Sequence, residues 1–169
     1  MAPVVRRTWA PRGHTPILAQ RTRSHRKVSA IAALTLAPRR HRVGLYFTLY
    51  PDANITTAEV VRFLRHLRRQ LQRPLVVLWD RLGAHHSAAV RRFLARVHHL
   101  HLEYLPPYAP ELNHVELLWS HLKGNALANF APANVEDLHR ATRRSLRGLR
   151  RRYPLLRALL AGTPLSLLP

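Results

Sequence analysis

The stretch LVVLWDRLGAHHSAAVRRFLARVHHLHLEYLPPYAPELNHVELLWSHLK, residues 75–123, carries most of the information about fold and function. It begins with an apolar run that ends abruptly at Asp80, and it places Glu116 one turn into an expected helix. The chain between these two acids is long enough for a helix, a strand and a rigid loop. Two carboxylates brought in this way to one end of a sheet can hold divalent metal for phosphodiester chemistry. The stretch therefore makes this chain a candidate nucleic-acid-cutting domain.

The overall composition is strongly basic. The 169 residues contain 28 Lys and Arg against 8 Asp and Glu, a formal net charge of +20. Such a charge predicts a polyanionic partner, with nucleic acid favoured over a membrane surface. All of the basic residues except Lys27 and Lys123 are arginine, which the codon bias of a GC-rich genome would also produce. The charge therefore permits nucleic-acid binding without establishing it.

Other features narrow the class of protein. The chain has no cysteine, which excludes disulfides and thiolate metal sites. No run of about 18 apolar residues occurs, so no transmembrane helix is expected. The first residues, MAPVVRRTWAPRG, lack the apolar segment of a signal peptide. We expect a cytoplasmic, nucleoid-associated protein that does not enter a membrane.

Local patterns predict strands that alternate with helices. Residues 1–27 form an irregular basic N-terminal segment, and residues 28–37 and 43–50 are two apolar runs typical of a β-hairpin. Thr56 and Glu59 form a capping box that begins a helix. Residues 75–80 are continuously apolar before Asp80, as in a strand buried on both faces of a parallel sheet.

Further caps complete the pattern. Ser87 and Asn134 each begin a helix, residues 100–105 form a strand, and Asn113 caps a helix that carries Glu116. The order β-β-α-β-α-β-α-α predicts one α/β domain with a mixed sheet, covering residues 28–150. Residues 151–169 would then form a C-terminal helical tail.

Each of the two acids has a structural alternative. Ligands of open α/β sheets collect beyond the carboxyl ends of strands, which favours a site role for Asp80 over the capping of a turn. Glu116 is less clear, because an Asn cap with Glu at the third helical position is a common helix start. Glu116, Ser120 and Lys123 share a face that points away from the core. The cap and ligand interpretations of Glu116 both stay open on the pattern alone.

These segments resemble the DDE superfamily endonuclease domain of bacterial insertion-sequence transposases, in the branch related to mariner elements. The family pattern is an Asp at a strand end, a His five residues later, a Leu-Pro-x-Tyr-Ser/Ala-Pro-Asp/Glu-Leu-Asn-Pro-x-Glu segment, and then Trp and Lys. The matching positions here are Asp80, His85, residues 105–113, Glu116, Trp119 and Lys123. RRTWAPRGHTP, residues 6–16, also resembles a segment of these transposases.

The resemblance implies an RNase H-like fold, a mixed sheet flanked by helices. In this family three acids hold two Mg²⁺ ions that activate water or a 3′-hydroxyl against a phosphodiester. Asp80 would be the second catalytic and metal-binding acid, and Glu116 the third. The partners implied are DNA, both insertion-sequence ends and target, and further copies of the complete transposase in an oligomer.

Two departures from the family pattern matter. The family's first catalytic Asp lies on the first, central strand, just before the segment that matches residues 6–16, whereas this chain has no acid before Asp52. We therefore expect an N-terminally truncated domain that lacks its first central strand, with a possible upstream-frame product as partner. His114 stands where the family usually has Pro, a change expected to cost little.

Candidate DNA contacts lie outside the two acids. His85 could contact a DNA phosphate or orient the site, and Lys123 lies on the helix face of Glu116. The densest run of arginines, residues 140–152, is the preferred phosphate track, although a solvated helix face would look the same. The named candidates in this run are Arg140, Arg143, Arg144 and Arg147.

The sequence thus predicts a transposase catalytic-domain fragment for Mg²⁺-dependent DNA strand cleavage and transfer. Without the first Asp, the chain alone should be inactive. Two alternatives stay open: a non-catalytic basic nucleic-acid-binding remnant on the same scaffold, and a structure-specific nuclease of RNase H-like fold with a different set of acids.

Overall fold

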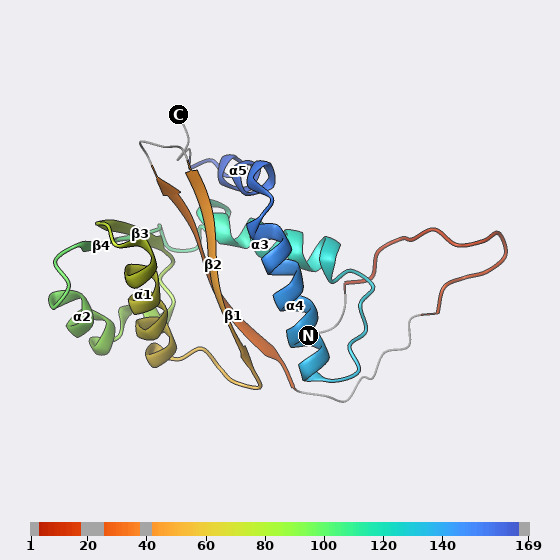
Figure 1. The fold of residues 1–169 in the computed structure, drawn as a ribbon, viewed down its shortest axis with the longest axis horizontal. Coiled ribbons are helices and arrows are strands. Elements are labelled where there is room, and N and C mark those ends of the chain that lie inside the picture. The colour runs from red at the N-terminus through yellow and green to blue at the C-terminus, as the bar shows by residue number, and fades with distance from the viewer. Residues whose placement is uncertain (1–3, 18–25, 38–41, 166–169) are drawn as a thin grey trace.

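A long β-hairpin runs through the middle of the molecule (Figure 1). The computed structural model describes residues 4–17, 26–37 and 42–165. Strands β1 (Val28–Ala37) and β2 (Arg42–Pro51) pair antiparallel over their full length, from Val28 opposite Pro51 to Ala37 opposite Arg42. The predicted hairpin is confirmed, with β2 one residue longer at each end than its apolar run.

A second sheet forms from two short parallel strands. β3 (Leu75–Trp79) and β4 (Leu100–Tyr104) pair in register, with Trp79 opposite Tyr104 at the carboxyl end. Helix α2 (Ala88–Ala95) makes the crossover between them, since parallel strands cannot be joined by a tight turn. Both strands therefore end on the same side of the sheet, at their carboxyl ends, directly before Asp80 and Leu105.

The strands lie in two separate sheets, although the sequence pattern predicts a single mixed sheet. Within the described ranges, β1 hydrogen-bonds only with β2, and β3 only with β4. Helix α1 (Thr57–Leu71) carries the chain from the hairpin to β3. Among the residues that the structure describes, β1 and β3 each have one edge without a partner strand, a feature that pattern alone did not reveal.

Helices cover the two faces of the hairpin. α1 and α2 lie on one side with β3 and β4; α3 (His114–His121), α4 (Val135–Arg150) and α5 (Tyr153–Ala161) lie on the other (Figure 1). Alternate residues of β1 accordingly point into different cores, with Ile31 towards α1 and Leu34 towards α3 and α4. One turn of π-helix (Leu122–Ala126) extends α3.

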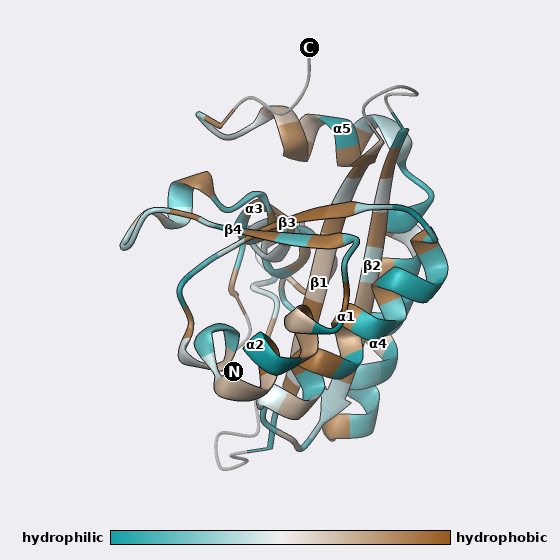
Figure 2. Ribbon diagram, turned by 90° about the vertical axis from the view of Figure 1, so that its left-hand side faces the viewer, coloured by the Kyte–Doolittle hydropathy of each residue, from teal (hydrophilic) through white to brown (hydrophobic). Residues whose placement is uncertain are grey.

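Two hydrophobic clusters hold these layers together. Leu45, fully buried on β2, packs with buried leucines of α3, α4 and α5. Val60 and Val90, equally buried, join α1 and α2 to Trp79. α1 and α4 both carry hydrophilic and hydrophobic residues along their length (Figure 2), as amphipathic helices do when only one face is buried.

The four predicted helix caps are confirmed. Thr56 and Glu59 form the capping box of α1, with both of its hydrogen bonds present. The side chains of Ser87, Asn113 and Asn134 accept hydrogen bonds from Val90, Val115 and Asp137 backbone amides at the starts of α2, α3 and α4. These short-range bonds satisfy amides that the helix cannot satisfy itself.

The prediction that β3 is buried on both faces is wrong. Val76 is 67% exposed and Leu78 is 40% exposed, although both belong to a strand that is hydrophobic almost throughout (Figure 2). Only the face with Val77 and Trp79 packs against α1 and α2. The other face, with Val76 and Leu78, is largely open to solvent in the described part of the chain. Among all the residues that the structure describes, no helix is both long enough and apolar enough to cross a membrane.

Candidate functional site

Asp80 follows β3 at the carboxyl edge of the parallel sheet. Beyond the strand pair, the Leu105 amide still donates to the Trp79 carbonyl over 2.9 Å, which fixes the backbone directly before Asp80. The Arg81 side chain adds a second tie, because its Nε donates to the Leu105 carbonyl over 3.2 Å. Asp80 thus projects from a rigid strand end, the position at which α/β sheets bind ligands.

The two carboxylate oxygens of Asp80 differ in their surroundings. Oδ1 accepts a hydrogen bond from the Leu82 amide over 3.1 Å and lies 2.8 Å from Nδ1 of His85. In the described part of the chain no hydrogen bond engages Oδ2, and the side chain is 50% exposed. Asp80 is therefore held through one oxygen and presents the other to solvent. The turn-capping bond is present at Oδ1, and the open Oδ2 is compatible with the predicted site role.

His85 is itself fixed in place. Its ring stacks on Trp79, with centroids 4.3 Å apart and planes within 5°, and its side chain is only 13% exposed. Nδ1 also lies 3.2 Å from the Asp80 carbonyl oxygen. Because both neighbours of Nδ1 are acceptors, the contact requires a proton on this nitrogen. His85 is thus positioned to orient Asp80, one of the two roles open on sequence grounds.

A second stack lies beside the first. The His86 ring stacks on Tyr104 at 4.5 Å, and the guanidinium of Arg81 lies 5.6 Å from the centroid of the Tyr104 ring. The 3-10 turn Gly83–His86 is therefore held against the ends of both parallel strands. Sequence reasoning missed this double stack, because the aromatic residues belong to different strands. The only available signal was the pair of adjacent histidines after a strand that ends in Trp.

Glu116 does not act as a helix cap. The Asn113 amide, which a capping box would bond to Glu116, donates to the Pro110 carbonyl over 3.0 Å. The Glu116 side chain is exposed and has no hydrogen bond or ion pair within the described residues. In α1, by contrast, the Glu59 carboxylate bonds the Thr56 amide over 3.0 Å. The capping explanation for Glu116 therefore has no contact behind it, and the ligand interpretation stays a prediction.

His114, the residue in the family's Pro position, is buried. It is 7% exposed, and its Nε2 lies 2.8 Å from Thr163 Oγ1 and 3.1 Å from the Leu165 carbonyl. These contacts join the first turn of α3 to the segment after α5. The side chain therefore points into the protein, on the opposite side of the helix turn from the exposed Glu116.

The two acids are suited to a hard divalent cation, but two carboxylates would be only part of such a site. Mg²⁺ prefers oxygen ligands and keeps several waters, which fits the free Oδ2 of Asp80 and the unpaired carboxylate of Glu116. Across the described ranges, no three His, Asp or Glu side chains gather closely enough to hold a metal ion. A complete site would need a further carboxylate.

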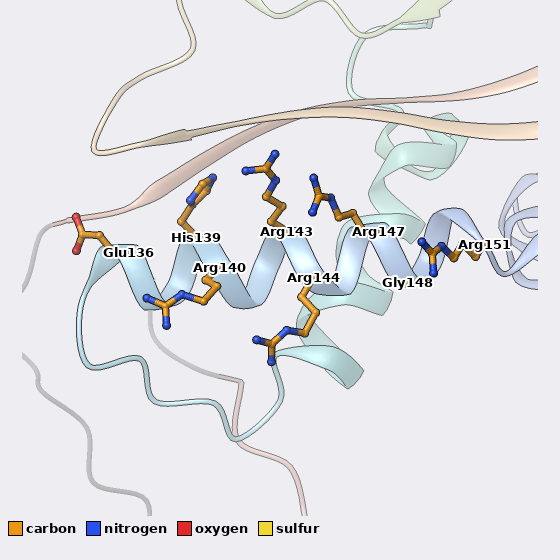
Figure 3. Close-up of a pocket in the computed structure, with 8 residues that line it drawn as sticks. All are labelled: Glu136, His139, Arg140, Arg143, Arg144, Arg147, Gly148 and Arg151. Carbon is orange, nitrogen blue, oxygen red and sulfur yellow. The ribbon is translucent and has the colours of Figure 1, made fainter.

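A row of exposed arginines follows the outer face of α4. Together with neighbouring residues they line a surface hollow of about 700 Å³, in which His139, Arg143 and Arg147 point to one side and Arg140 and Arg144 to the other (Figure 3). None of these arginines pairs with a carboxylate in the described part of the chain. Lys123, in the π-turn after α3, is half-buried.

Comparison with known proteins gives one family match for the chain. The sequence profile of a family described as DDE superfamily endonuclease matches residues 1–139. No curated protein sequence matches the chain significantly.

Three solved structures share the fold. The Mos1 strand transfer complex is 19% identical in sequence, with a TM-score of 0.57. The alignment covers 92% of this chain and 50% of the Mos1 chain. The Mos1 transposase paired-end complex with left transposon end is 17% identical, with a TM-score of 0.55, and the alignment covers 96% of this chain and 52% of that one. The Mos1 mariner paired-end complex with Mn is also 17% identical, with a TM-score of 0.51, and the alignment covers 98% of this chain and 53% of that one. The chain spans about half the length of these transposases, and the expected RNase H-like α/β fold is confirmed.

Proposed function

The chain belongs to the DDE superfamily of endonucleases, and we propose that it is the greater part of a transposase catalytic domain that cuts and joins DNA at insertion-sequence ends. The observation that carries this proposal is the state of the two acids. Asp80 is held through Oδ1 with Oδ2 open, and Glu116 is exposed with no capping bond. Carboxylates maintained free in this way favour a ligand role over a structural one.

Asp80 and Glu116 would be the protein ligands of Mg²⁺. Bound Mg²⁺ would supply a water or 3′-hydroxyl nucleophile and charge stabilisation on the leaving oxygen. The chain's own contribution is to hold the ligands. The strand end and His85 fix Asp80, while the Asn113 cap fixes the helix that carries Glu116.

The third carboxylate would come from a strand outside the described residues. This strand would pair with the free edge of β3 in parallel and with the free edge of β1 antiparallel, and would end beside Asp80. One observation supports it: β1 and β3 lie in separate sheets within the described residues. The strand could belong to the same encoded polypeptide or to an upstream-frame product. The 169 residues alone would then be inactive.

DNA would lie along α4. Arg140, Arg143, Arg144 and Arg147 are exposed and free of carboxylate partners among the described residues, as a phosphate track requires. Lys123 would add a contact near Glu116. His85, buried in its stack, would orient Asp80 rather than contact phosphate. Such a protein would associate with the nucleoid and act as an oligomer on paired ends.

The test is Mg²⁺-dependent nicking of DNA that carries the insertion-sequence end. The 169-residue chain is compared with a version extended by the residues encoded immediately upstream. We expect only the extended chain, and not the 169-residue chain, to cut. In the extended chain, Asp80→Asn and Glu116→Gln should each abolish cutting while DNA binding persists. Cutting by the extended chain that survives both substitutions would contradict the proposed roles.

A non-catalytic DNA-binding role is the second candidate. It is favoured by the lack of a three-ligand cluster in the described part of the chain. If DNA is bound by both the 169-residue and the extended chain, and neither cuts with Mg²⁺ or Mn²⁺, this role replaces the catalytic one.

A further inference from the structure

The segment from Leu105 to Asn113 connects the surroundings of the two acids. At its start, Leu105 is bonded through its amide to the Trp79 carbonyl over 2.9 Å, next to Asp80. At its end, Asn113 caps α3, and the Glu116 amide donates to the Asn113 carbonyl over 2.9 Å. The middle of this segment therefore lies, along the chain, between the surroundings of the two acids.

The segment is stiff. Pro106, Pro107 and Pro110 restrict three of its φ angles. The Leu112 amide bonds the Ala109 carbonyl over 3.1 Å, and the Asn113 amide bonds the Pro110 carbonyl over 3.0 Å. A side chain carried by such a loop has a fixed origin and loses little backbone entropy when it binds a partner.

Two features of Tyr108 in this loop are energetically unfavourable, its backbone conformation and the exposure of its ring. Its φ is +56°, in the left-handed region that favours Gly or Asn after the proline of a tight turn. Its side chain is also completely exposed, with a relative accessibility of 102%, and no described residue contacts the ring. A strained backbone and an unburied aromatic ring at one position have no explanation in the packing of the fold. Such outliers are frequent at ligand-binding sites.

We propose that Tyr108 is a nucleobase-binding residue, whose ring stacks on an unpaired base at the DNA end held between Asp80 and Glu116. This inference rests on the proposed function and names a contact within it. A ring stacks on a base only where the base face is free, as at a frayed or cleaved end. The charge of the surroundings favours nucleic acid over an apolar protein partner, because the chain carries +20 and the exposed Arg81 lies at the same strand end.

The test compares two DNAs of equal length and two variants of the full chain. One DNA is a blunt duplex, and the other ends in an unpaired tail whose terminal base is 2-aminopurine. Tyr108→Phe retains the ring, whereas Tyr108→Gly removes it and relaxes the backbone. Binding is measured by anisotropy, and stacking by quenching of 2-aminopurine fluorescence.

The wild-type chain and the Tyr108→Phe variant should quench the tail base and bind tailed DNA alike. The Tyr108→Gly variant should lose the quenching and bind tailed DNA roughly tenfold to a hundredfold more weakly, the usual effect of losing one stacked base. Its affinity for blunt duplex should be unchanged. Its thermal midpoint should equal or exceed that of the wild type, because the strain is relieved.

The alternatives give different results. If Tyr108→Gly quenches and binds like the wild type, the stacking role is overturned while DNA binding through α4 stands. If Tyr108→Gly unfolds at a lower temperature, the ring is structural, and the proposal is again overturned. If the wild-type chain binds neither DNA, both the stacking role and the proposed function are contradicted.

Discussion

The Nδ1 atom of His85 lies 2.8 Å from Oδ1 of Asp80, and the His85 ring stacks on Trp79, the residue directly before that acid. One side chain therefore couples the end of β3 to the orientation of the carboxylate. The contact leaves Oδ2 of Asp80 open. A candidate metal ligand is thus held by a bond that does not compete with the metal.

Two substitutions of His85 should distinguish what the stack on Trp79 and the hydrogen bond to Asp80 each contribute to the free energy of unfolding. We expect His85→Phe, which retains an aromatic ring, to lower the free energy of unfolding by about 0.5–1.5 kcal/mol through loss of one hydrogen bond. His85→Ala should lose a further 0.5–1.5 kcal/mol or so, because the stack on Trp79 disappears. Urea unfolding measures both. Equal stabilities of the two variants would show that the stack contributes nothing.

The capping box of α1 and the exposed Glu116 at the start of α3 should respond differently to substitution. Glu59 bonds the Thr56 amide over 3.0 Å in a complete capping box, whereas the Asn113 amide at the other helix start bonds Pro110 instead of Glu116. We expect Thr56→Ala to cost about 1 kcal/mol of unfolding free energy. Glu116→Gln should change it by less than about 0.5 kcal/mol, as surface substitutions do. A loss at Glu116 as large as that at Thr56 would restore the capping interpretation.

The capping box should also produce a pH dependence. Hydrogen bonds from the Thr56 side chain and backbone lower the pKa of Glu59 below its usual value. The bonds favour the ionised carboxylate in the folded state, so this stabilisation is complete above the unfolded pKa of the group. It is lost as the pH falls through the lowered, folded-state pKa. Stability curves of the wild type and Glu59→Gln should therefore converge on acidification, and parallel curves would contradict the assignment.

The arginines of α4 should set the salt dependence of DNA binding. Each of Arg140→Gln, Arg143→Gln, Arg144→Gln and Arg147→Gln should reduce the slope of log affinity against log salt by about 0.9, the value for one lost phosphate contact. Arg62→Gln is the control, because Arg62 is also an exposed helix arginine but belongs to α1, which lies on the other side of the hairpin from α4. An Arg62 variant with the same loss of slope would show that the charge acts without a defined track.

The sequence predicted best what depends on neighbouring residues. The caps at Thr56, Ser87, Asn113 and Asn134 are confirmed because each side chain bonds an amide two or three residues away. The hairpin is confirmed because its strands are adjacent in sequence and rich in residues that favour sheets.

Long-range relationships were not predictable in the same way. The LVVLW run of β3 indicated burial on both faces, but burial depends on which strand or helix covers it, and Val76 is 67% exposed. Whether β1 and β3 share a sheet likewise depends on a strand between them. His114 was expected to be a neutral replacement for Pro, yet it bonds Thr163, 49 residues away. That Glu116 does not close a capping box was visible only from the Asn113–Pro110 hydrogen bond.

The central claim is that Asp80 and Glu116 converge on one divalent cation. The most direct measurement is paramagnetic broadening of backbone amide NMR signals during a Mn²⁺ titration of the 169-residue chain, with Asp80→Asn as control. We expect signals near Asp80 and signals at the start of α3 to broaden together, and both effects to disappear in the variant. Broadening centred elsewhere, or broadening around Glu116 that is unchanged by Asp80→Asn, would contradict it.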